Sequence, residues 1–227
     1  MIRLFAYLFA HRGFHSENIP PNSIASLEAA HEYKFQAVEF DIWFLEGKLL
    51  LKHDEPKAEE LPSLPHFRDY FRFKNDMDYW LDFKNLDEKN AREALILVKK
   101  DLDEAGINMQ RIYFAPFITD YELAKKVFVE IRNIFGNEAQ LVAVCEDGKN
   151  IEILYNFLTK NNVKSLSINH KIIDKDFMKK FSNIQIFAWT VNDLERLLEL
   201  EALGVKNFAT DKITPQNYDK NSHSSRT

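Results

Sequence analysis

The sequence of 227 residues lacks three features that mark large classes of protein. Its one cysteine, Cys145, excludes an internal disulfide and favours a reducing compartment, so we expect a cytoplasmic location. The 30 lysines and arginines stand against 35 aspartates and glutamates, and a net charge of −5 excludes a broad basic surface for nucleic acid. No apolar run approaches the roughly 20 residues that span a bilayer, which excludes a transmembrane segment.

What is present indicates a globular chain. Hydrophobic residues make up 45% and charged residues 29%, which excludes wholesale disorder. At roughly 100–200 residues per domain, we expect one domain over residues 1–217, followed by a loose polar tail over 218–227. The start superficially resembles a secretory signal, but it runs directly into His11 and we interpret it as a buried strand. The sequence gives no clear signal for an oligomer.

Apolar runs typical of β-strands alternate with segments of helical period, the pattern of a parallel sheet with helical crossovers. The eight expected strands are Leu4–Ala10, Ala37–Phe44, Asp78–Lys84, Arg111–Phe117, Gln140–Glu146, Val163–Asn169, Ile184–Val191 and Asn207–Thr210. Eight such units in this length predict an α/β fold, the TIM (β/α)8 barrel, whose working groups lie after the strand C-termini. The rival, an open doubly wound sheet, lacks a Gly-x-Gly-x-x-Gly after the first strand.

Two details of the barrel are specified further. Glu46 and Gly47 predict a turn into a second short run, Lys48–His53, which gives a hairpin after the second strand. The following stretch, 54–76, contains three prolines and predicts a loop with at most a short helix. Asn192 is the candidate N-cap of the last crossover helix.

Charged and imidazole side chains gather where the expected strands end. They are His11, Arg12, Glu39, Asp41, His53, Asp54, Asp82 and Lys84. Residues two apart on a strand share one face, so Glu39 and Asp41 point together. Inward carboxylates near a barrel mouth suit a hard cation such as Mg²⁺ or Ca²⁺, with Asp82 as a third ligand. Periodicity alone leaves an alternative, in which Glu39 and Asp41 lie on an exposed face.

At these residues a family resemblance appears. The runs His11-Arg12-Gly13, Asn22-Ser23 opening a helix, Glu39-Phe40-Asp41, Gly47 and His53-Asp54 together resemble the signature of the glycerophosphodiester phosphodiesterases. Asp82-Phe83-Lys84 resembles the family's Glu-x-Lys strand, Trp189-Thr190-Val191-Asn192 its seventh strand, and Gly204-Val205 through Thr210-Asp211 its eighth. The resemblance covers nearly the whole chain.

The resemblance implies a metal-dependent barrel that cleaves glycerophosphodiesters to glycerol 3-phosphate and an alcohol. It implies that Glu39, Asp41 and Asp82 hold a divalent cation, Mg²⁺ or Ca²⁺, and that His11 and His53 are the acid/base pair. Arg12 and Lys84 suit the charge of a small-molecule phosphodiester. Trp189 either flanks the carbon skeleton of the substrate or is a core aromatic. The nucleophile is either the glycerol hydroxyl, through a cyclic phosphate, or a water.

Three departures from the family pattern bear on this function. Pro21 replaces a usual carboxylate, Asp82 replaces a usual glutamate and reaches one methylene less, and only the segment Glu55–Met77 occupies the place of a long insertion. The shortened insertion leaves the site open to a bulkier substrate. Two alternatives therefore stand beside the main hypothesis: a lipid phosphodiesterase of the sphingomyelinase D type, and a barrel that binds phosphodiesters without catalysis.

Three residues near these motifs receive separate interpretations. His15, four residues after His11, does not form the His-x-His of metal-dependent amidohydrolases, and we interpret it as a loop residue. Glu146, at the end of the fifth strand, is a reserve metal ligand. Cys145 is expected to be a small core hydrophobe.

Overall fold

The computed structural model describes residues 6–73, 76–146 and 148–224, with side chains as far as Lys220. Within these ranges nine strands form one sheet, in the order β1-β9-β8-β7-β6-β5-β4-β2-β3. The strands are β1 (Tyr7–Ala10), β2 (Ala37–Leu45), β3 (Lys48–Leu51), β4 (Asp78–Phe83), β5 (Ile112–Pro116), β6 (Gln140–Cys145), β7 (Ser165–Asn169), β8 (Gln185–Trp189) and β9 (Asn207–Thr210). All eight expected barrel strands form; Leu4 and Phe5, at the start of the first, lie outside the described residues.

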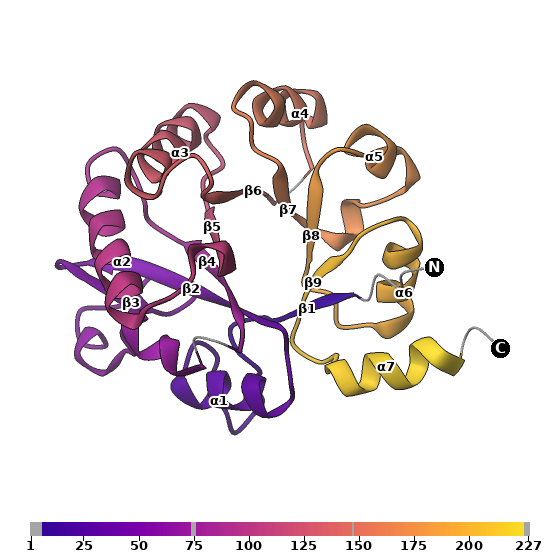
Figure 1. Cartoon of the computed structure of the whole chain (residues 1–227), viewed down its shortest axis with the longest axis horizontal. Coiled ribbons are helices and arrows are strands. Elements are labelled where there is room, and N and C mark those ends of the chain that lie inside the picture. The colour runs from indigo at the N-terminus through magenta and orange to yellow at the C-terminus, as the bar shows by residue number, and fades with distance from the viewer. Residues whose placement is uncertain (1–5, 74–75, 147, 225–227) are drawn as a thin grey trace.

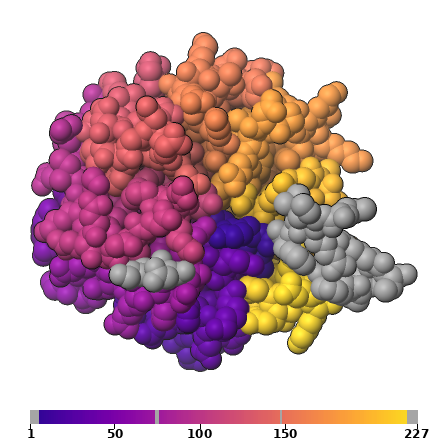
Figure 2. Space-filling model, viewed as in Figure 1, coloured from indigo at the N-terminus to yellow at the C-terminus, as the bar shows by residue number. Residues whose placement is uncertain are grey.

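The sheet closes on itself. β3 pairs antiparallel with β2, as the hairpin predicted, and every other pairing is parallel. β1 pairs with β2 on one side and with β9 on the other, which closes the ring. In the space-filling view the first described residues, in indigo, lie beside yellow C-terminal residues (Figure 2). The prediction of a TIM barrel is confirmed.

Helices surround the strands (Figure 1). They are α1 (Ile24–Glu32), α2 (Ala91–Ala105), α3 (Tyr121–Phe135), α4 (Ile151–Lys160), α5 (Lys175–Lys180), α6 (Leu194–Ala202) and α7 (Pro215–Ser224). Short 3₁₀ segments lie at Leu61–Ser63, Phe67–Phe73, Met109–Arg111 and His170–Ile172. None of the helices in the described part of the chain is both long and apolar enough to cross a bilayer.

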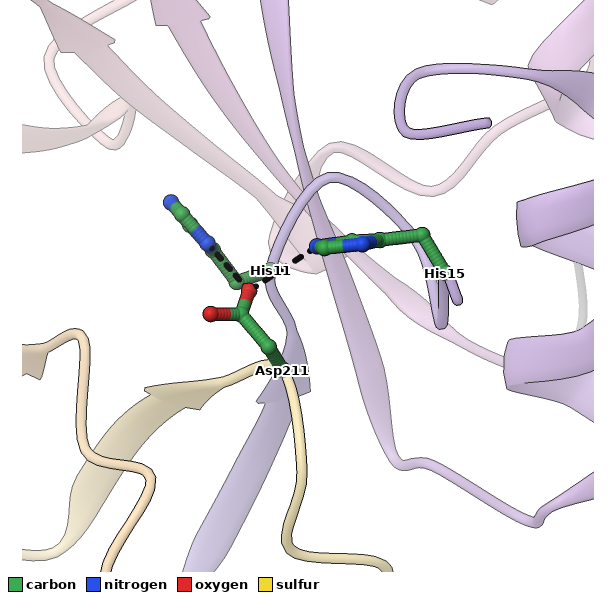
Figure 3. A group of neighbouring side chains, drawn as sticks. All are labelled: His11, His15 and Asp211. Atoms are coloured by element: carbon green, nitrogen blue, oxygen red, sulfur yellow. Dashed lines mark hydrogen bonds and ion pairs between the residues drawn. The ribbon is translucent and has the colours of Figure 1, made fainter. Parts of the chain in front are cut away.

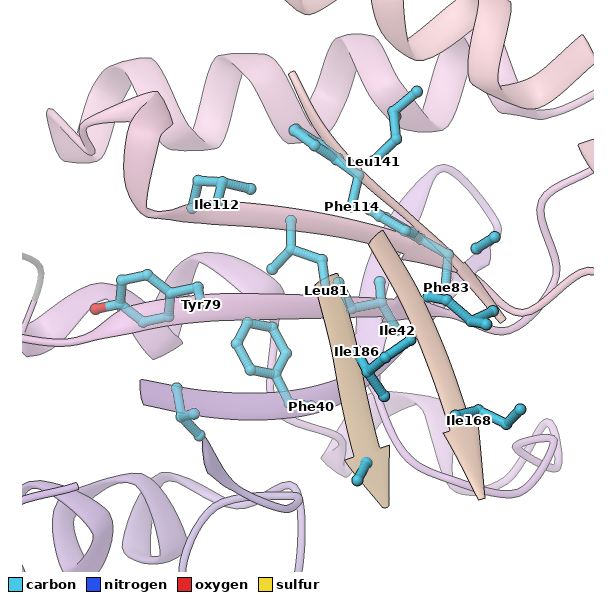
Figure 4. Packing of buried hydrophobic residues seen from close by; sticks show 14 of the residues in the cluster. Phe40, Ile42, Tyr79, Leu81, Phe83, Ile112, Phe114, Leu141, Ile168 and Ile186 are labelled. Carbon is cyan, nitrogen blue, oxygen red and sulfur yellow. The ribbon is translucent and has the colours of Figure 1, made fainter. Parts of the chain in front are cut away.

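Alternate residues of each strand serve two different cores, because successive side chains of a strand point to opposite faces. One set, including Phe40, Leu81 and Phe114, packs outward beneath the helices (Figure 4). The other set, including Phe9, Trp80 and Phe187, fills the barrel interior. These three inner rings meet edge to face or tilted, with centroids 5.2–5.6 Å apart. The packed interior closes the lower barrel, so that only its upper end is left for polar groups.

The described residues of the connection from β3 to β4 form no α-helix. Its 3₁₀ segment Phe67–Phe73 buries Phe67, Tyr70 and Phe71, and Phe40 of β2 packs on Tyr70 with ring centroids 4.5 Å apart. The Tyr70 hydroxyl donates to the Ser23 carbonyl at 2.9 Å. The short segment therefore covers β2 in the place of a crossover helix. A loop with at most a short helix was expected here.

The expected loose tail begins differently in the structure. α7 includes residues 218–224, and Tyr218 is buried. The Tyr218 hydroxyl donates to Glu201 Oε1 at 2.7 Å and accepts from the Ala6 amide at 3.2 Å. This one anchored aromatic ties the start of the polar stretch to the barrel, while residues 225–227 lie outside the described residues.

The turn after β1 requires a left-handed backbone at Arg12 (φ 57°) and Gly13 (φ 75°). A Cβ on Gly13 would lie 2.3 Å from Ser26 Oγ and 2.8 Å from the Ser26 carbonyl carbon. Gly47, at the tip of the hairpin, has a similar φ of 69° but open space around it. A side chain at either position would be strained by the positive φ, but only a side chain at Gly13 would also overlap a neighbouring residue.

We predict that Gly13→Ala lowers the thermal unfolding midpoint more than Gly47→Ala. Both variants bear the left-handed strain of about 1–2 kcal/mol, and Gly13→Ala adds an overlap with Ser26 that costs about 1–3 kcal/mol more. Thermal melts followed by circular dichroism measure both. Equal shifts in the two variants would show that the approach to Ser26 does not limit stability.

Candidate active site

Three carboxylates meet at the upper end of β2 and β4. Asp41 and Asp82 are register partners on these neighbouring strands, and Glu39 precedes Asp41 on the same face. Oxygen atoms of the three lie within 4.8 Å of one another. Glu39 is 3% and Asp41 1% exposed, so the alternative of a solvent-facing pair is wrong. Val38, Phe40 and Ile42 of β2 pack in the core beneath the helices, which leaves Glu39 and Asp41 facing the interior.

Basic groups partly compensate this buried negative charge. Lys84 Nζ lies 2.7 Å from both Asp41 Oδ1 and Asp82 Oδ2. Arg12 Nε is 3.3 Å from Asp41 Oδ2, an ion pair without hydrogen-bond alignment. The Arg12 amide donates to Glu39 Oε2 at 2.9 Å. Asp82 Oδ1, by contrast, is buried and has no partner among the described residues, which leaves one oxygen open to a ligand.

Asn22 fixes the position of Asp41. Its side-chain amide donates to Asp41 Oδ2 at 2.7 Å, and its side-chain oxygen accepts from the Asp41 amide at 3.0 Å. Asn22 itself has a left-handed φ of 56° and precedes Ser23, which caps α1. The motif included Asn22, but the sequence did not indicate that its side chain reaches across to β2.

The carboxylates bear the electrostatic cost of their burial. Desolvation, followed by repulsion from Asp41 and Asp82, raises the pKa of Glu39 well above its usual range. Desolvation raises the pKa of Asp82 to about 6, against the opposing effect of Lys84. Burial alone would lower the pKa of Lys84, but Asp82 and Asp41 outweigh it and the pKa is raised. Lys84 therefore does not fully offset the negative charge of Glu39, Asp41 and Asp82.

His11 stands between the carboxylate cluster and Asp211. Its Nδ1 lies 2.7 Å from Asp211 Oδ1, while its Nε2 is 3.8 Å from Glu39 Oε2. An ionised carboxylate only accepts hydrogen bonds, so Nδ1 of neutral His11 carries the proton and Nε2 keeps a lone pair. Desolvation lowers the pKa of His11, and Asp211 opposes that shift.

His15 reaches the same carboxylate. Its Nε2 lies 3.0 Å from Asp211 Oδ1, and Figure 3 shows both rings directed at that oxygen from different sides. The loop that carries His15 is braced by two backbone hydrogen bonds between Ser16 and Ile19, of 3.0 and 3.1 Å. His15 is a loop residue, as expected, but the sequence did not indicate its contact with Asp211.

Asn192 holds Asp211 from the other side. Its Nδ2 donates to Asp211 Oδ2 at 2.8 Å, and its Oδ1 accepts from the Asp211 amide at 2.8 Å. Burial would raise the pKa of Asp211, but the bonds from His11, His15 and Asn192 lower it well below its usual range. The prediction that Asn192 caps the following helix is wrong, because Asp193 accepts from the Arg196 amide and caps α6. Asn and Asp are equally favourable N-cap residues, so the sequence alone does not distinguish Asn192 from Asp193.

His53 follows the hairpin and is more open to solvent. Its Nδ1 lies 2.7 Å from Asp54 Oδ1, and its side chain is 44% exposed. Trp43 Nε1 donates to the His53 carbonyl at 3.3 Å. Both histidines thus place a carboxylate on Nδ1, which leaves each Nε2 available to a ligand.

All eight site residues predicted from the sequence line one cavity of about 400 Å³. They are His11, Arg12, Glu39, Asp41, His53, Asp82, Lys84 and Trp189. Trp43, Trp80, Phe117, Val144, Glu146 and Ser167 complete its lining. Glu146 lies in the lining but outside the carboxylate cluster, and none of the described residues of the segment Glu55–Met77 contributes to it. Trp189 also packs on the inner core, as expected of a core aromatic, and its role beside the substrate stays a prediction.

Solved structures of other proteins share the barrel fold of this chain. No protein-family model and no curated protein matches the sequence. Among solved structures, a glycerophosphodiester phosphodiesterase from Parabacteroides distasonis is similar at 20% identity and a TM-score of 0.77, over 98% of this chain and 100% of that one. A phosphodiesterase from Oleispira antarctica, in complex with the product sn-glycerol 3-phosphate, matches at 17% identity and 0.79, over 96% and 97%.

A glycerophosphodiester phosphodiesterase from Thermotoga maritima is similar at 18% identity and a TM-score of 0.71, over 96% of this chain and 98% of that one. Each likeness runs through the full barrel of both proteins. At these identities the likeness establishes the fold of the chain. The resemblance to glycerophosphodiester phosphodiesterases that the motifs indicated is confirmed for the fold.

Proposed function

We propose that the chain is a metal-dependent phosphodiesterase that hydrolyses glycerophosphodiesters to glycerol 3-phosphate and an alcohol. One observation carries the proposal: two buried carboxylates, the half-buried Asp82 and two histidines, each histidine with a carboxylate on Nδ1, share a single cavity. Unpaired buried charge is costly to keep for structure alone, which favours a site over a packing role. The fold shared with solved glycerophosphodiester phosphodiesterases supports the same reaction class.

The donor set fits a divalent cation. Glu39, Asp41 and Asp82 offer oxygens within 4.8 Å of one another, the spacing that one ion can bridge, and Mg²⁺ and Ca²⁺ prefer such ligands. The orphaned Asp82 Oδ1 and the raised pKa values of Glu39 and Asp82 indicate that positive charge is missing there. When bound, such an ion supplies Lewis-acid stabilisation of negative charge on the phosphoryl group.

The remaining groups of the cavity suit the phosphate and the proton transfers. Arg12 and Lys84 supply fixed positive charge for the phosphodiester anion. Asp211 fixes the His11 ring, and Asp54 lies at the same position on His53. Two imidazoles with a free Nε2 can take a proton from the nucleophile and give one to the leaving oxygen.

The cavity suits a small ester. Its volume of about 400 Å³ matches a small-molecule site rather than a lipid tunnel. The similar structure from Oleispira antarctica holds sn-glycerol 3-phosphate, which supports a glycerol phosphate ester as the substrate. Such a reaction belongs to glycerol and lipid metabolism. The single buried Cys145 is compatible with the reducing cytoplasm, where we propose that the protein acts.

Addition of Mg²⁺ or Ca²⁺ is expected to raise the thermal unfolding midpoint. An ion at 100 times its Kd stabilises the folded state by about 2.7 kcal/mol. This corresponds to a rise of roughly 5–10 °C at this chain length. Asp82→Asn should remove most of the shift, whereas Asp103→Asn, on the exposed face of α2, should keep it. A midpoint that ignores both cations would contradict the metal site.

His11→Ala and His53→Ala are each expected to lower kcat on glycerophosphocholine by about 10²–10⁴ because each removes a proton-transfer group. His31→Ala, which removes a histidine paired with Asp76 outside the cavity, serves as the matched control. A chelator should abolish turnover. Full activity in His11→Ala would overturn the proposal, binding without turnover would favour a non-catalytic barrel, and activity on lysophospholipid alone would favour the sphingomyelinase D type.

Asp211→Asn is expected to lower kcat by about 10²–10⁴, an effect comparable to the loss of a triad aspartate in serine proteases. The amide of Asn can donate to His11 Nδ1 and so favour the tautomer that has no lone pair on Nε2. The cation-induced rise in unfolding midpoint should persist, since Asp211 lies outside the carboxylate cluster. Unchanged kcat with the metal bound would show that Asp211 does not orient the His11 ring.

A further inference from the structure

His15 is a polar side chain to which the proposed reaction gives no role. Its Nε2 lies 3.0 Å from Asp211 Oδ1, the same oxygen that lies 2.7 Å from His11 Nδ1 (Figure 3). Ligand atoms of the three residues lie within 4.8 Å of one another. Among the residues that the structure describes, two such groups of three occur, and the other is the carboxylate cluster. The two groups meet at His11, whose Nε2 is 3.8 Å from Glu39 Oε2.

Asp211 has no lysine or arginine partner in the described part of the chain. Its side chain is 23% exposed, and its side-chain contacts are two imidazoles on Oδ1 and the amide of Asn192 on Oδ2. A carboxylate that is largely removed from water is costly without a compensating charge. The place beside Oδ1, between the two rings, therefore suits a cation.

The types of donor atom select which cation binds there. Two imidazole nitrogens and one carboxylate oxygen suit Zn²⁺ and other first-row transition metals, whereas Mg²⁺ and Ca²⁺ take oxygen ligands. Two ligand atoms of a tetrahedral zinc ion stand about 3.4 Å apart, so the distances of 2.7 and 3.0 Å need to widen by less than about 1 Å. Three protein ligands with a fourth position open to water are typical of an accessible zinc site.

Hydrogen bonds hold the ligands in place without an ion. The His11 amide donates to the Thr210 carbonyl at 3.1 Å, which joins the two chain segments that carry the ligands. Asn192 donates to Asp211 Oδ2 and accepts from the Asp211 amide. Ligating carboxylates in metalloproteins are supported in the same way by residues that do not touch the metal. The site is therefore preformed.

We propose that His11, His15 and Asp211 form a second metal site, for zinc and chemically similar transition metals, and that its occupation inhibits the enzyme. Without zinc, Nδ1 of His11 carries the ring proton and Nε2 keeps a lone pair. Coordination uses the Nδ1 lone pair, so the one ring proton passes through solvent to Nε2. The same exchange moves the His15 ring proton from Nε2 to Nδ1. His11 then has no lone pair with which to accept a proton from the nucleophile. The inhibition rests on the proposed function, and the binding of zinc does not.

Isothermal titration calorimetry with Zn²⁺, on a chain without an affinity tag and with Ca²⁺ in excess, tests the site. One zinc equivalent should be weakened by about 100-fold or more in His15→Asn, because a change to a residue that only hydrogen-bonds a ligand already costs about 10–100-fold. The same equivalent should persist in Asp82→Asn, which disrupts the carboxylate cluster. His31→Asn, which removes the histidine of a separate pair with Asp76, should leave it unchanged.

Two results of the titration would overturn the site. One is the absence of zinc binding by the wild-type protein. The other is the reverse pattern, in which the zinc equivalent is lost in Asp82→Asn and kept in His15→Asn, because that pattern would put the ion in the carboxylate cluster.

Nitrogen NMR of the histidine rings follows the displaced proton directly. The His11 ring, assigned by its absence in His11→Asn, should carry its proton on Nδ1 without zinc and on Nε2 after one equivalent of zinc. A ring that keeps its Nδ1 proton when zinc is bound would overturn the proposed coordination.

The inhibition is measured on glycerophosphocholine with Ca²⁺ or Mg²⁺ present. Saturating zinc should lower the rate by about 10²–10⁴, the contribution of one proton-transfer group. His15→Asn should raise the zinc concentration for half inhibition by about 100-fold or more, with each variant compared with its own zinc-free rate. Unchanged turnover with zinc bound at His15 would overturn the inhibition. If the wild-type protein hydrolyses no diester, zinc binding that depends on His15 still supports the site, and the proposed function alone is overturned.

Discussion

The meeting of Glu39, Asp41 and Asp82 inside the barrel is the constraint on which the site depends. Three carboxylates with oxygen atoms within 4.8 Å of one another repel one another, and burial penalises their charges. The surrounding residues respond to this repulsion. Lys84 bridges two of the three acids, and Asn22 holds Asp41 with a pair of hydrogen bonds. The left-handed turn at Arg12 brings its amide to Glu39.

The barrel makes this concentration of charge tolerable by dividing its interior into two levels. Phe9, Trp80 and Phe187 pack the lower level, so apolar contacts fill this level without any polar group. The upper level is then available for groups selected by chemistry rather than by packing. On β4 the change from the apolar level to the polar level occurs over two residues, from Trp80 to Asp82, which share the inward face of the strand.

The strands were predictable from a period of two, which also places Glu39 and Asp41 on one face, but periodicity alone did not decide which face that is. Once Val38, Phe40 and Ile42 are assigned to the helix-facing core, Glu39 and Asp41 must face the interior. The partners of His11 were not predictable in this way. Asp211 meets His11 through ring closure, at a separation of 200 residues, and no local pattern encodes that distance. Similarly, the helical start of the polar tail depends on the burial of one residue, Tyr218.

The pairing of β1 with β9 has a consequence for biosynthesis. His11 follows the first described strand and Asp211 follows the last one. A nascent chain on the ribosome therefore holds both histidines and all three acids long before it holds Asp211, the carboxylate on His11 Nδ1. The candidate site is complete only after translation has passed β9. An incomplete chain is therefore without its oriented imidazole, whatever structure its earlier strands have reached.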